Sequence, residues 1–232
     1  MPLIVLWDID HTLIENSGVS KEIYAAAFTT AAGHPPTRPA RTEGRTDRLI
    51  LAEMFRDHGI EPPPWEFSAR ALQAAGAQRE AELAQRGRAL PGAREALTAV
   101  AAQPDMISSV LTGNIAANAK VKLRAFDLDV LLDMECGAYG EHSEDRAALV
   151  KVARDHIQET HGLAHETPVV LIGDTPRDVQ AAHDSGAHII AVASGVHSAQ
   201  QLAAAGATVV LDELADTPGL LTRLRKLSHA SD

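Results

Sequence analysis

Short apolar runs alternate with longer amphipathic segments along most of this chain, and this alternation limits the possible folds more than any other feature. Each run has the length of one buried strand, and the segments between the runs carry helical spacing. Strands that alternate with helices are typical of a parallel sheet covered by helices on both faces. The candidate strands are Leu3–Trp7, Ile107–Leu111, Val130–Met134, Val169–Ile172, Ile189–Ala193 and Val209–Leu211.

One interval interrupts the alternation. Between Thr12 and Leu90 we find no strand pattern, and three helices are predicted instead, over Lys21–Ala32, Asp47–Asp57 and Glu66–Gln85. Proline clusters, which cannot continue a helix, separate them. We therefore expect an α/β core formed by residues 1–16 and 88–232, with an all-α cap, residues 17–87, inserted after the first strand.

The first strand ends at a pair of carboxylates. Asp8 and Asp10 follow Leu3–Trp7 directly and are separated only by Ile9. Strand alternation would send both side chains to the same side, where like charges repel. A divalent cation, or a proton held by one carboxylate, would relieve that repulsion. Because ligands of α/β proteins bind beyond the carboxyl ends of the strands, we expect a metal and phosphate site here.

Later strands end in segments of similar chemistry. Thr112, Gly113 and Asn114 follow one strand and precede a helix, so a hydroxyl and backbone N–H groups are placed where they suit phosphate oxygens. Asp145-Arg146 begins another helix. Gly173 and Asp174 end a further strand. Asp8, Asp10 and Asp174 together offer the oxygen ligands that Mg²⁺ prefers.

Composition excludes several classes of function. The net charge of -10 argues against non-specific nucleic-acid binding, which needs a basic face. Cys136 is the single cysteine, so an intramolecular disulfide is impossible, and we expect a small residue in a buried strand rather than a reactive thiol. No apolar stretch has the length of a signal-peptide core or a membrane span. We expect a cytoplasmic protein with no nucleic-acid or membrane partner.

Three motifs in this order resemble those of the haloacid dehalogenase (HAD) superfamily, in particular its phosphoglycolate-phosphatase-like group with a helical cap. The matching residues are Asp8-Ile9-Asp10-His11-Thr12, Thr112-Gly113-Asn114 and Gly173-Asp174-Thr175-Pro176-Arg177-Asp178. The resemblance covers the whole core and implies a Rossmann-like parallel sheet. The predicted cap also resembles that of the family in its position and length.

The resemblance also implies roles for these residues. Asp8 would attack phosphorus, and Asp10 would protonate the leaving oxygen and later activate water. Thr112 would hold phosphoryl oxygens. Mg²⁺ would be bound by Asp8, the Asp10 backbone carbonyl and Asp174, with Asp178 orienting the metal shell or its waters. A second Asp favours phosphate-ester hydrolysis over dehalogenation, because a halide leaves without a proton.

Two positions depart from the family pattern. His11 stands where the family usually has glycine, and it either biases specificity or points away from the substrate. The usual lysine of the third motif is replaced by the segment Glu144-Asp145-Arg146. We favour Arg146 for its phosphate-binding role, with Lys151 as the fallback, because arginine binds phosphate in bidentate fashion.

Arginines also gather in the predicted cap around Gly44. We expect Arg45 to meet an anionic or polyhydroxylated part of the substrate when the cap closes; a solvated basic turn is the alternative.

The sequence thus predicts a Mg²⁺-dependent phosphatase acting on a small phosphorylated metabolite, as a monomer or homodimer. A phosphomutase of the same fold is the nearest alternative, and a dehalogenase or a non-catalytic phospho-aspartate switch is weaker. Phosphoglycolate, a sugar phosphate, a nucleotide and a biosynthetic intermediate all remain possible substrates, because fold-level resemblance does not transfer specificity.

Overall fold

A computed structural model describes residues 1–228. Its main sheet is parallel throughout, with the order β5-β4-β1-β6-β7-β8. The strands are β1 (Leu3–Trp7), β4 (Met106–Leu111), β5 (Asp133–Ala138), β6 (Val169–Gly173), β7 (His188–Val192) and β8 (Val210–Leu211). The predicted Rossmann-like α/β core is therefore confirmed.

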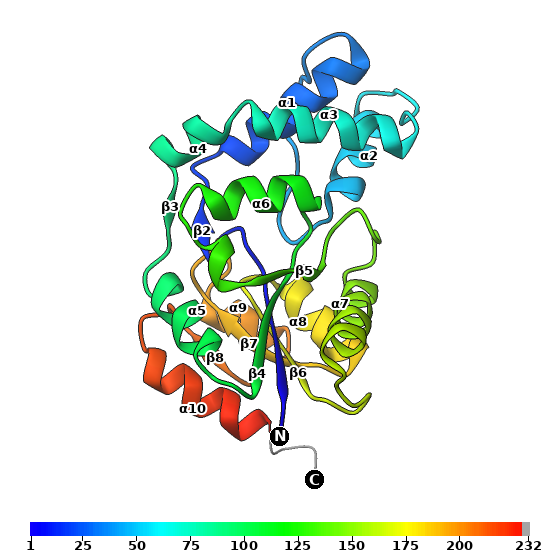
Figure 1. Ribbon diagram of the computed structural model, residues 1–232. Coiled ribbons are helices and arrows are strands. Elements are labelled where there is room, and N and C mark those ends of the chain that lie inside the picture. Colours follow the sequence, from blue (N-terminus) through cyan, green and yellow to red (C-terminus); the bar gives the residue numbers. More distant parts are fainter. Residues whose placement is uncertain (229–232) are drawn as a thin grey trace.

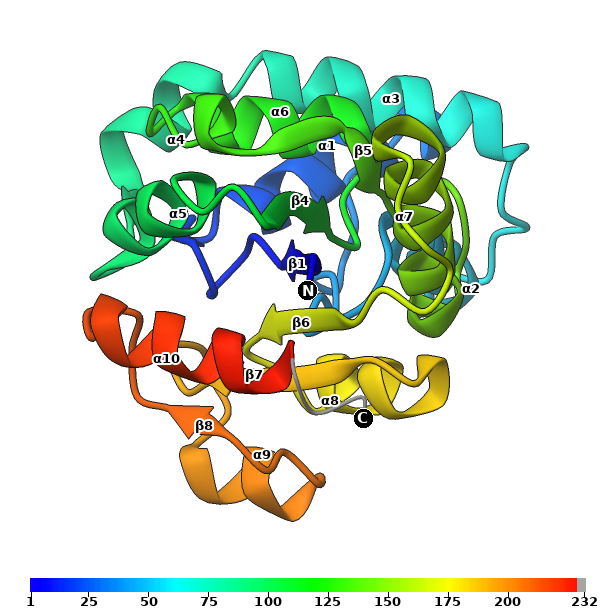
Figure 2. The same ribbon diagram turned by 60° about the horizontal axis from the view of Figure 1, so that its bottom comes forward.

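Helices cover both faces of this sheet. α5 (Ala93–Ala101) and α10 (Thr217–Leu227) lie on one side, and α7 (Arg146–His161) and α8 (Pro176–Ser185) lie on the other (Figure 2). α9 (Ala199–Ala204) contributes Leu202 to the second side. β1 alternates between the two cores, with Trp7 in the first and Leu6 in the second, which explains why its run is apolar throughout.

A third hydrophobic cluster belongs to the helices between β1 and β4. α1 (Val19–Ala32), α2 (Asp47–Asp57), α3 (Trp65–Ala77) and α4 (Glu80–Arg86) pack around Phe28, Phe55 and Leu72. They form a layer above the carboxyl ends of the strands, and α6 (Ala116–Arg124) lies between this layer and the sheet (Figure 1). α6 packs against both the sheet and the helical layer, because Leu123 lies in the sheet core and Ala117 contacts the helical cluster.

A two-stranded ribbon joins the helical layer to the core. β2 (Ile14–Glu15) pairs antiparallel with β3 (Arg88–Ala89), where the chain leaves and re-enters the core. The expectation that no strand lies between Thr12 and Leu90 was wrong, because strands of two residues are too short to show a pattern. In the described part of the chain no helix has the length and apolarity that crossing a membrane requires.

Two further predictions of elements were wrong. The strand expected over Val130–Met134 is displaced: Asp129–Leu131 is a 3-10 helix, η1, with Val130 79% exposed, and β5 starts at Asp133. Its second half consists of Cys, Gly and Ala, whose small side chains give no strand pattern. The helix expected over Glu66–Gln85 is divided into α3 and α4 near Gly76, a poor helix former, and α4 turns Leu83 into the helical cluster.

Candidate active site

The predicted site residues, with the exception of the fully buried Asp178, line one cavity beyond the carboxyl ends of β1, β4 and β6. Asp8 and Asp10 follow β1, Thr112 to Asn114 follow β4, and Asp174 follows β6. The helical layer closes the other side with residues of α1 and of the loop before α2. The cavity is lined by Asp8, Asp10, His11, Asn16, Gly18, Ser20, Lys21, Tyr24, Thr42, Glu43, Gly44, Arg45, Thr112, Gly113, Asn114, Arg146, Asp174, Thr175 and Val196.

Arg146 connects two buried carboxylates. Its Nη2 lies 2.8 Å from Asp8 Oδ1 and 2.6 Å from Asp178 Oδ1, and its Nε donates to the same Asp178 oxygen at 2.8 Å. The Nη2 atom is buried, and its two contacts are ion pairs without hydrogen-bond alignment. The fallback Lys151 lies elsewhere, 76% exposed and paired with Asp155. The start of α7 places Arg146 here because Asp145 caps that helix through Ala147 N.

Asp8 belongs to a crowded acidic group. Oxygen atoms of Asp8, Asp174 and Asp178 all lie within 4.8 Å of one another. Burial raises the pKa of Asp8 to about 6, although Arg146 opposes the rise. Burial, reinforced by Asp8 and Asp178, also raises the pKa of Asp174 well above its usual value.

Asp178 is already engaged within its own helix. Thr175 and Asp178 form a capping box at the start of α8, and Asp178 Oδ2 accepts from the Thr175 hydroxyl at 2.7 Å. With Arg146 on its other oxygen, Asp178 has fewer free lone pairs than Asp8 or Asp174. Thr12 supports the group by donating to Asp174 Oδ1 at 3.4 Å.

Asp10 has a separate cation, Lys122 of α6. The ammonium lies 2.8 and 2.6 Å from the two carboxylate oxygens and donates to Asn114 Oδ1 at 2.7 Å. Asn16 and Asn114 donate to Asp10 as well, each at 2.8 Å. Burial alone would raise the pKa of Asp10, but Lys122 and the hydrogen bond from Asn114 lower it to about 2.

Sequence reasoning missed Lys122, although a signal was present. Ala119, Lys122 and Leu123 have the spacing of one helical face, and that face is buried in the sheet core. A lysine 2% exposed on an apolar face requires an acidic partner.

The start of α2 and the loop before it lie directly against the Thr112–Asn114 segment. Asp47 N donates to Gly113 O at 2.6 Å, and Asp47 Oδ2 accepts from Ile115 N at 2.8 Å. A side chain at Gly113 would meet the Arg45 carbonyl, since a Cβ there would lie 2.1 Å from that oxygen. Asp47 also accepts from the Tyr24 hydroxyl at 2.5 Å, and burial raises the pKa of Asp47 to about 6. Asp47 was expected only as a helix start.

The two residues expected to influence specificity, His11 and Arg45, both line the cavity. His11 Nδ1 contacts Glu15 Oε2 at 3.1 Å. The Arg45 side chain is 19% exposed. Its Nε lies 3.4 Å from Glu53 Oε2, and its Nη1 lies 3.8 Å from Glu43 Oε2. Arg45 is one of the residues that line the cavity, and its largely buried side chain does not fit a solvated basic turn.

Comparison with known proteins agrees with this arrangement. The chain is 29% identical over 236 residues to "Probable phosphatase IndB" of Dickeya dadantii (strain 3937), covering 99% of this chain and 98% of the relative. A hydrolase from Pseudomonas syringae superposes with a TM-score of 0.67 at 21% identity, covering 98% of this chain and 100% of that one. A predicted phosphoglycolate phosphatase from Haemophilus somnus 129pt superposes with a TM-score of 0.66 at 18% identity, covering 95% of this chain and 98% of that one.

These structural likenesses establish the fold, and the family follows from the sequence. The family model of haloacid dehalogenase-like hydrolases matches residues 5–183, a range that contains both aspartates after β1, the Thr112–Asn114 segment, Arg146, Asp174 and Asp178. With the motifs in order and their side chains gathered around one cavity, this chain belongs to the haloacid dehalogenase-like hydrolase family.

Proposed function

We propose that this protein is a Mg²⁺-dependent phosphatase that hydrolyses a small organic phosphate monoester through an aspartyl-phosphate on Asp8. The observation that carries the proposal is the division of the two carboxylates after β1. Asp8 contacts Arg146 and the acidic group, whereas Asp10 is held apart by Lys122 and Asn114. Two carboxylates in different surroundings suit a nucleophile and an acid/base.

The acidic group fits a divalent cation. Carboxylates of Asp8 and Asp174 are buried together, and the raised pKa values of both reflect the cost of ionising them without added positive charge. Hard oxygen ligands of this kind are those of Mg²⁺. Asp8, Asp174 and the Asp10 backbone carbonyl would hold the ion, with Asp178 orienting its waters. Bound there, Mg²⁺ would neutralise phosphoryl charge and keep Asp8 ionised.

The protein's own residues account for the two half-reactions. An Asp8 oxygen forms the bond to phosphorus while the bond to the leaving oxygen breaks, and Asp10 supplies a proton to that oxygen. Water then attacks the aspartyl-phosphate, Asp10 takes its proton, and the Asp8–phosphorus bond breaks to release phosphate. The low pKa of Asp10 suits the base of the second half-reaction; for the first, its carboxylate has to take up a proton from solvent or from the phosphate monoester as the substrate binds.

Phosphate binding is assigned to the segment after β4 and to Arg146. The Thr112 hydroxyl oxygen accepts from the Asn114 side chain at 2.7 Å, so its own O–H is free to donate to a phosphoryl oxygen. Gly113 supplies a backbone N–H, and the Arg146 guanidinium adds charge-assisted hydrogen bonds.

We further propose that residues 17–87 act as a cap over this site, hinged at the β2–β3 ribbon. The contacts between Asp47 and the Gly113–Ile115 backbone support a closed position. In that position Arg45 meets an anionic or polyhydroxylated leaving group. A small phosphorylated metabolite fits such an enclosed site, and the protein would need no nucleic acid or membrane.

A phosphate-release screen over a metabolite panel tests the proposal, with Mg²⁺ present and with a chelator. We expect Mg²⁺-dependent release from at least one compound and complete loss in Asp8→Asn. Turnover that survives Asp8→Asn would overturn the nucleophile assignment. Transfer of the phosphoryl group to a sugar phosphate, without release to water, would instead identify a mutase.

A further inference from the structure

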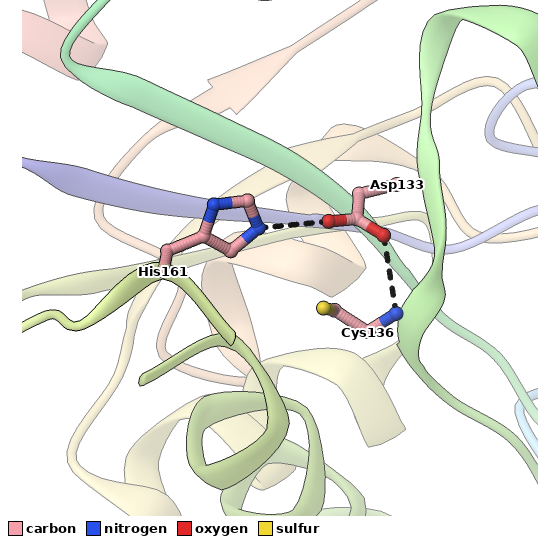
Figure 3. Close-up of side chains that lie close together, drawn as sticks. All are labelled: Asp133, Cys136 and His161. Carbon is pink, nitrogen blue, oxygen red and sulfur yellow. Dashed lines mark hydrogen bonds and ion pairs between the residues drawn. The ribbon is translucent and has the colours of Figure 1, made fainter. Parts of the chain in front are cut away.

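A second group of ligand-type side chains lies far from the acidic group of the active site. Asp133 begins β5, Cys136 follows three residues later, and His161 ends α7. One carboxylate oxygen, the thiol sulfur and one imidazole nitrogen all lie within 4.8 Å of one another. Figure 3 shows the three side chains converging from the strand and the end of the helix.

The local contacts already hold Asp133 between the other two residues. His161 Nε2 lies 2.8 Å from Asp133 Oδ2, and the backbone N–H of Cys136 donates to Asp133 Oδ1 at 3.2 Å. Cys136 is 2% exposed, whereas the side chains of Asp133 and His161 are 27% and 36% exposed. The thiol therefore forms the floor of the group, and the other two residues form a rim that solvent can reach.

This group is independent of the proposed catalytic site. α7 begins at Arg146 in the active site and ends at His161, and fifteen residues of helix correspond to about 22 Å. No residue of the group lines the active-site cavity. Its chemistry also differs, because a thiol and an imidazole are softer ligands than the carboxylates that suit Mg²⁺.

The charges match a divalent ion of the zinc type. A carboxylate and a thiolate supply two negative charges, and a neutral imidazole completes a set of three protein ligands from the usual tetrahedral repertoire of Zn²⁺. The exposed rim leaves a fourth position for water. Burial raises the pKa of the Cys136 thiol, so the free thiol keeps its proton, and a metal ion would displace it on binding.

We propose that Asp133, Cys136 and His161 form a second metal site, which binds Zn²⁺ through a carboxylate oxygen, a thiolate and an imidazole nitrogen. The bound ion links the edge strand β5 to the end of α7. Because it would join His161 to two residues of β5 that are distant in the sequence, it would bind only the folded chain and so stabilise the fold. The site is separate from the proposed Mg²⁺ site, and its occupancy does not depend on the phosphatase reaction.

Cobalt(II) titration of the intact protein tests this site directly, since Co²⁺ replaces Zn²⁺ and a Co²⁺–thiolate bond gives a near-ultraviolet charge-transfer band. Cys136 is the only cysteine in the chain, so such a band can arise nowhere else. With excess Mg²⁺ present to occupy the acidic group of the active site, we expect the band to saturate at one equivalent of Co²⁺ and to be removed by Zn²⁺. Metal binding without the band, or no binding, would overturn the proposal.

Three variants assign the ligands. Cys136→Ala should abolish the band, and His161→Ala should weaken cobalt binding by about tenfold or more. His165→Ala, which removes an exposed histidine four residues further on, should leave it unchanged. His161→Ala alters a partly exposed side chain, so it provides a result even if Cys136→Ala folds poorly. An equal affinity in His161→Ala and His165→Ala would contradict the assigned ligand set.

Discussion

Replacing Lys122 with methionine should change the pH dependence of the reaction more than its rate at high pH. In the structure the ammonium lies 2.8 and 2.6 Å from the two oxygens of Asp10. Methionine has nearly the same length and no charge, so it keeps the packing of α6 and removes the cation. Asp10 then stays buried with only its neutral donors, Asn16, Asn114 and the weaker contact from Ser20 at 3.4 Å.

The size of the effect follows from Coulomb's law. At this separation and an effective dielectric constant of about 20, the interaction is worth roughly 6 kcal/mol, which corresponds to about 4 pKa units. The pKa of Asp10, about 2 in the native protein, would rise to ~6 in Lys122→Met. Above that pH Asp10 is still the base that the second half-reaction needs; below it, a growing fraction is protonated and cannot accept the proton of water.

The assay is hydrolysis of 4-nitrophenyl phosphate, or of the best substrate from the screen, between pH 5 and 8. The kcat of Lys122→Met relative to Lys120→Met should fall about tenfold per pH unit below ~6. Lys120 is an exposed residue of the same helix and provides the matched control. At low pH the variant should also release a burst of nitrophenol equal to the enzyme concentration, because the phosphoenzyme forms but is slow to hydrolyse. A constant ratio of the two kcat values with no burst would refute this role for Lys122.

Stability provides a second measurement with the opposite pH trend. In the native protein the lowered pKa of Asp10 contributes stability above pH 4, which is lost as the pH falls through about 2. In Lys122→Met the raised pKa would reverse this: the variant should be most stable below pH 4 and lose stability as the pH rises through ~6. At pH 8 we expect urea denaturation to show a loss of about 3–5 kcal/mol, the usual cost of an uncompensated buried charge. Additive losses in Lys122→Met and Asp10→Asn would argue against a direct pair.

Three further outcomes are expected. Arg146→Ala should lower kcat by about 10²-fold or more, whereas Lys151→Ala should leave it unchanged; similar losses in steady-state assays of both would reject the choice of Arg146. Arg45→Ala should raise KM about tenfold for the true substrate and spare a small generic phosphate ester, so an equal effect on both esters would exclude a leaving-group contact. Asp47, with its pKa raised to about 6, should lose up to about 3 kcal/mol of stabilising free energy as the pH rises from 4 to 6, and urea titrations of Asp47→Asn should lack that dependence.

The sequence predicted which residues would meet, because parallel strands deliver their carboxyl ends to one edge of the sheet. It did not predict how the charge conflict between Asp8 and Asp10 is resolved. The structure adds a basic partner for each carboxylate, Arg146 for Asp8 and Lys122 for Asp10, and the pairing with Lys122 was not expected. Lys122 comes from a helix whose pattern resembles any amphipathic segment, so only its position on the buried face distinguishes it.

The predictions that failed share a physical cause. β5 begins later than its apolar run because hydrogen bonding to β4, and not hydrophobicity, defines an edge strand whose second half is small residues. α3 and α4 are separate because α4 turns to bury Leu83, a tertiary contact that no local spacing encodes. The residues whose environment is set by long-range packing, Asp47 and Tyr24 among them, were therefore the ones missed at the site as well.

His11 combines an unfavourable backbone conformation with a position in the lining of the cavity. Its φ is 61°, which lies in the left-handed region. A residue with a Cβ is disfavoured there by about 1–2 kcal/mol, whereas glycine is not. This difference accounts for the glycine that is usual in the family. Three contacts hold the conformation: His11 N donates to Ile14 O at 2.7 Å, His11 O accepts from Ser194 Oγ at 2.6 Å, and the ring contacts Glu15. The chain thus keeps an imidazole at the rim of the cavity, next to Asp10, against the preference of its backbone. Since Asp10 is the residue assigned to the leaving oxygen, we propose that this imidazole contributes to the choice of ester rather than to hydrolysis itself.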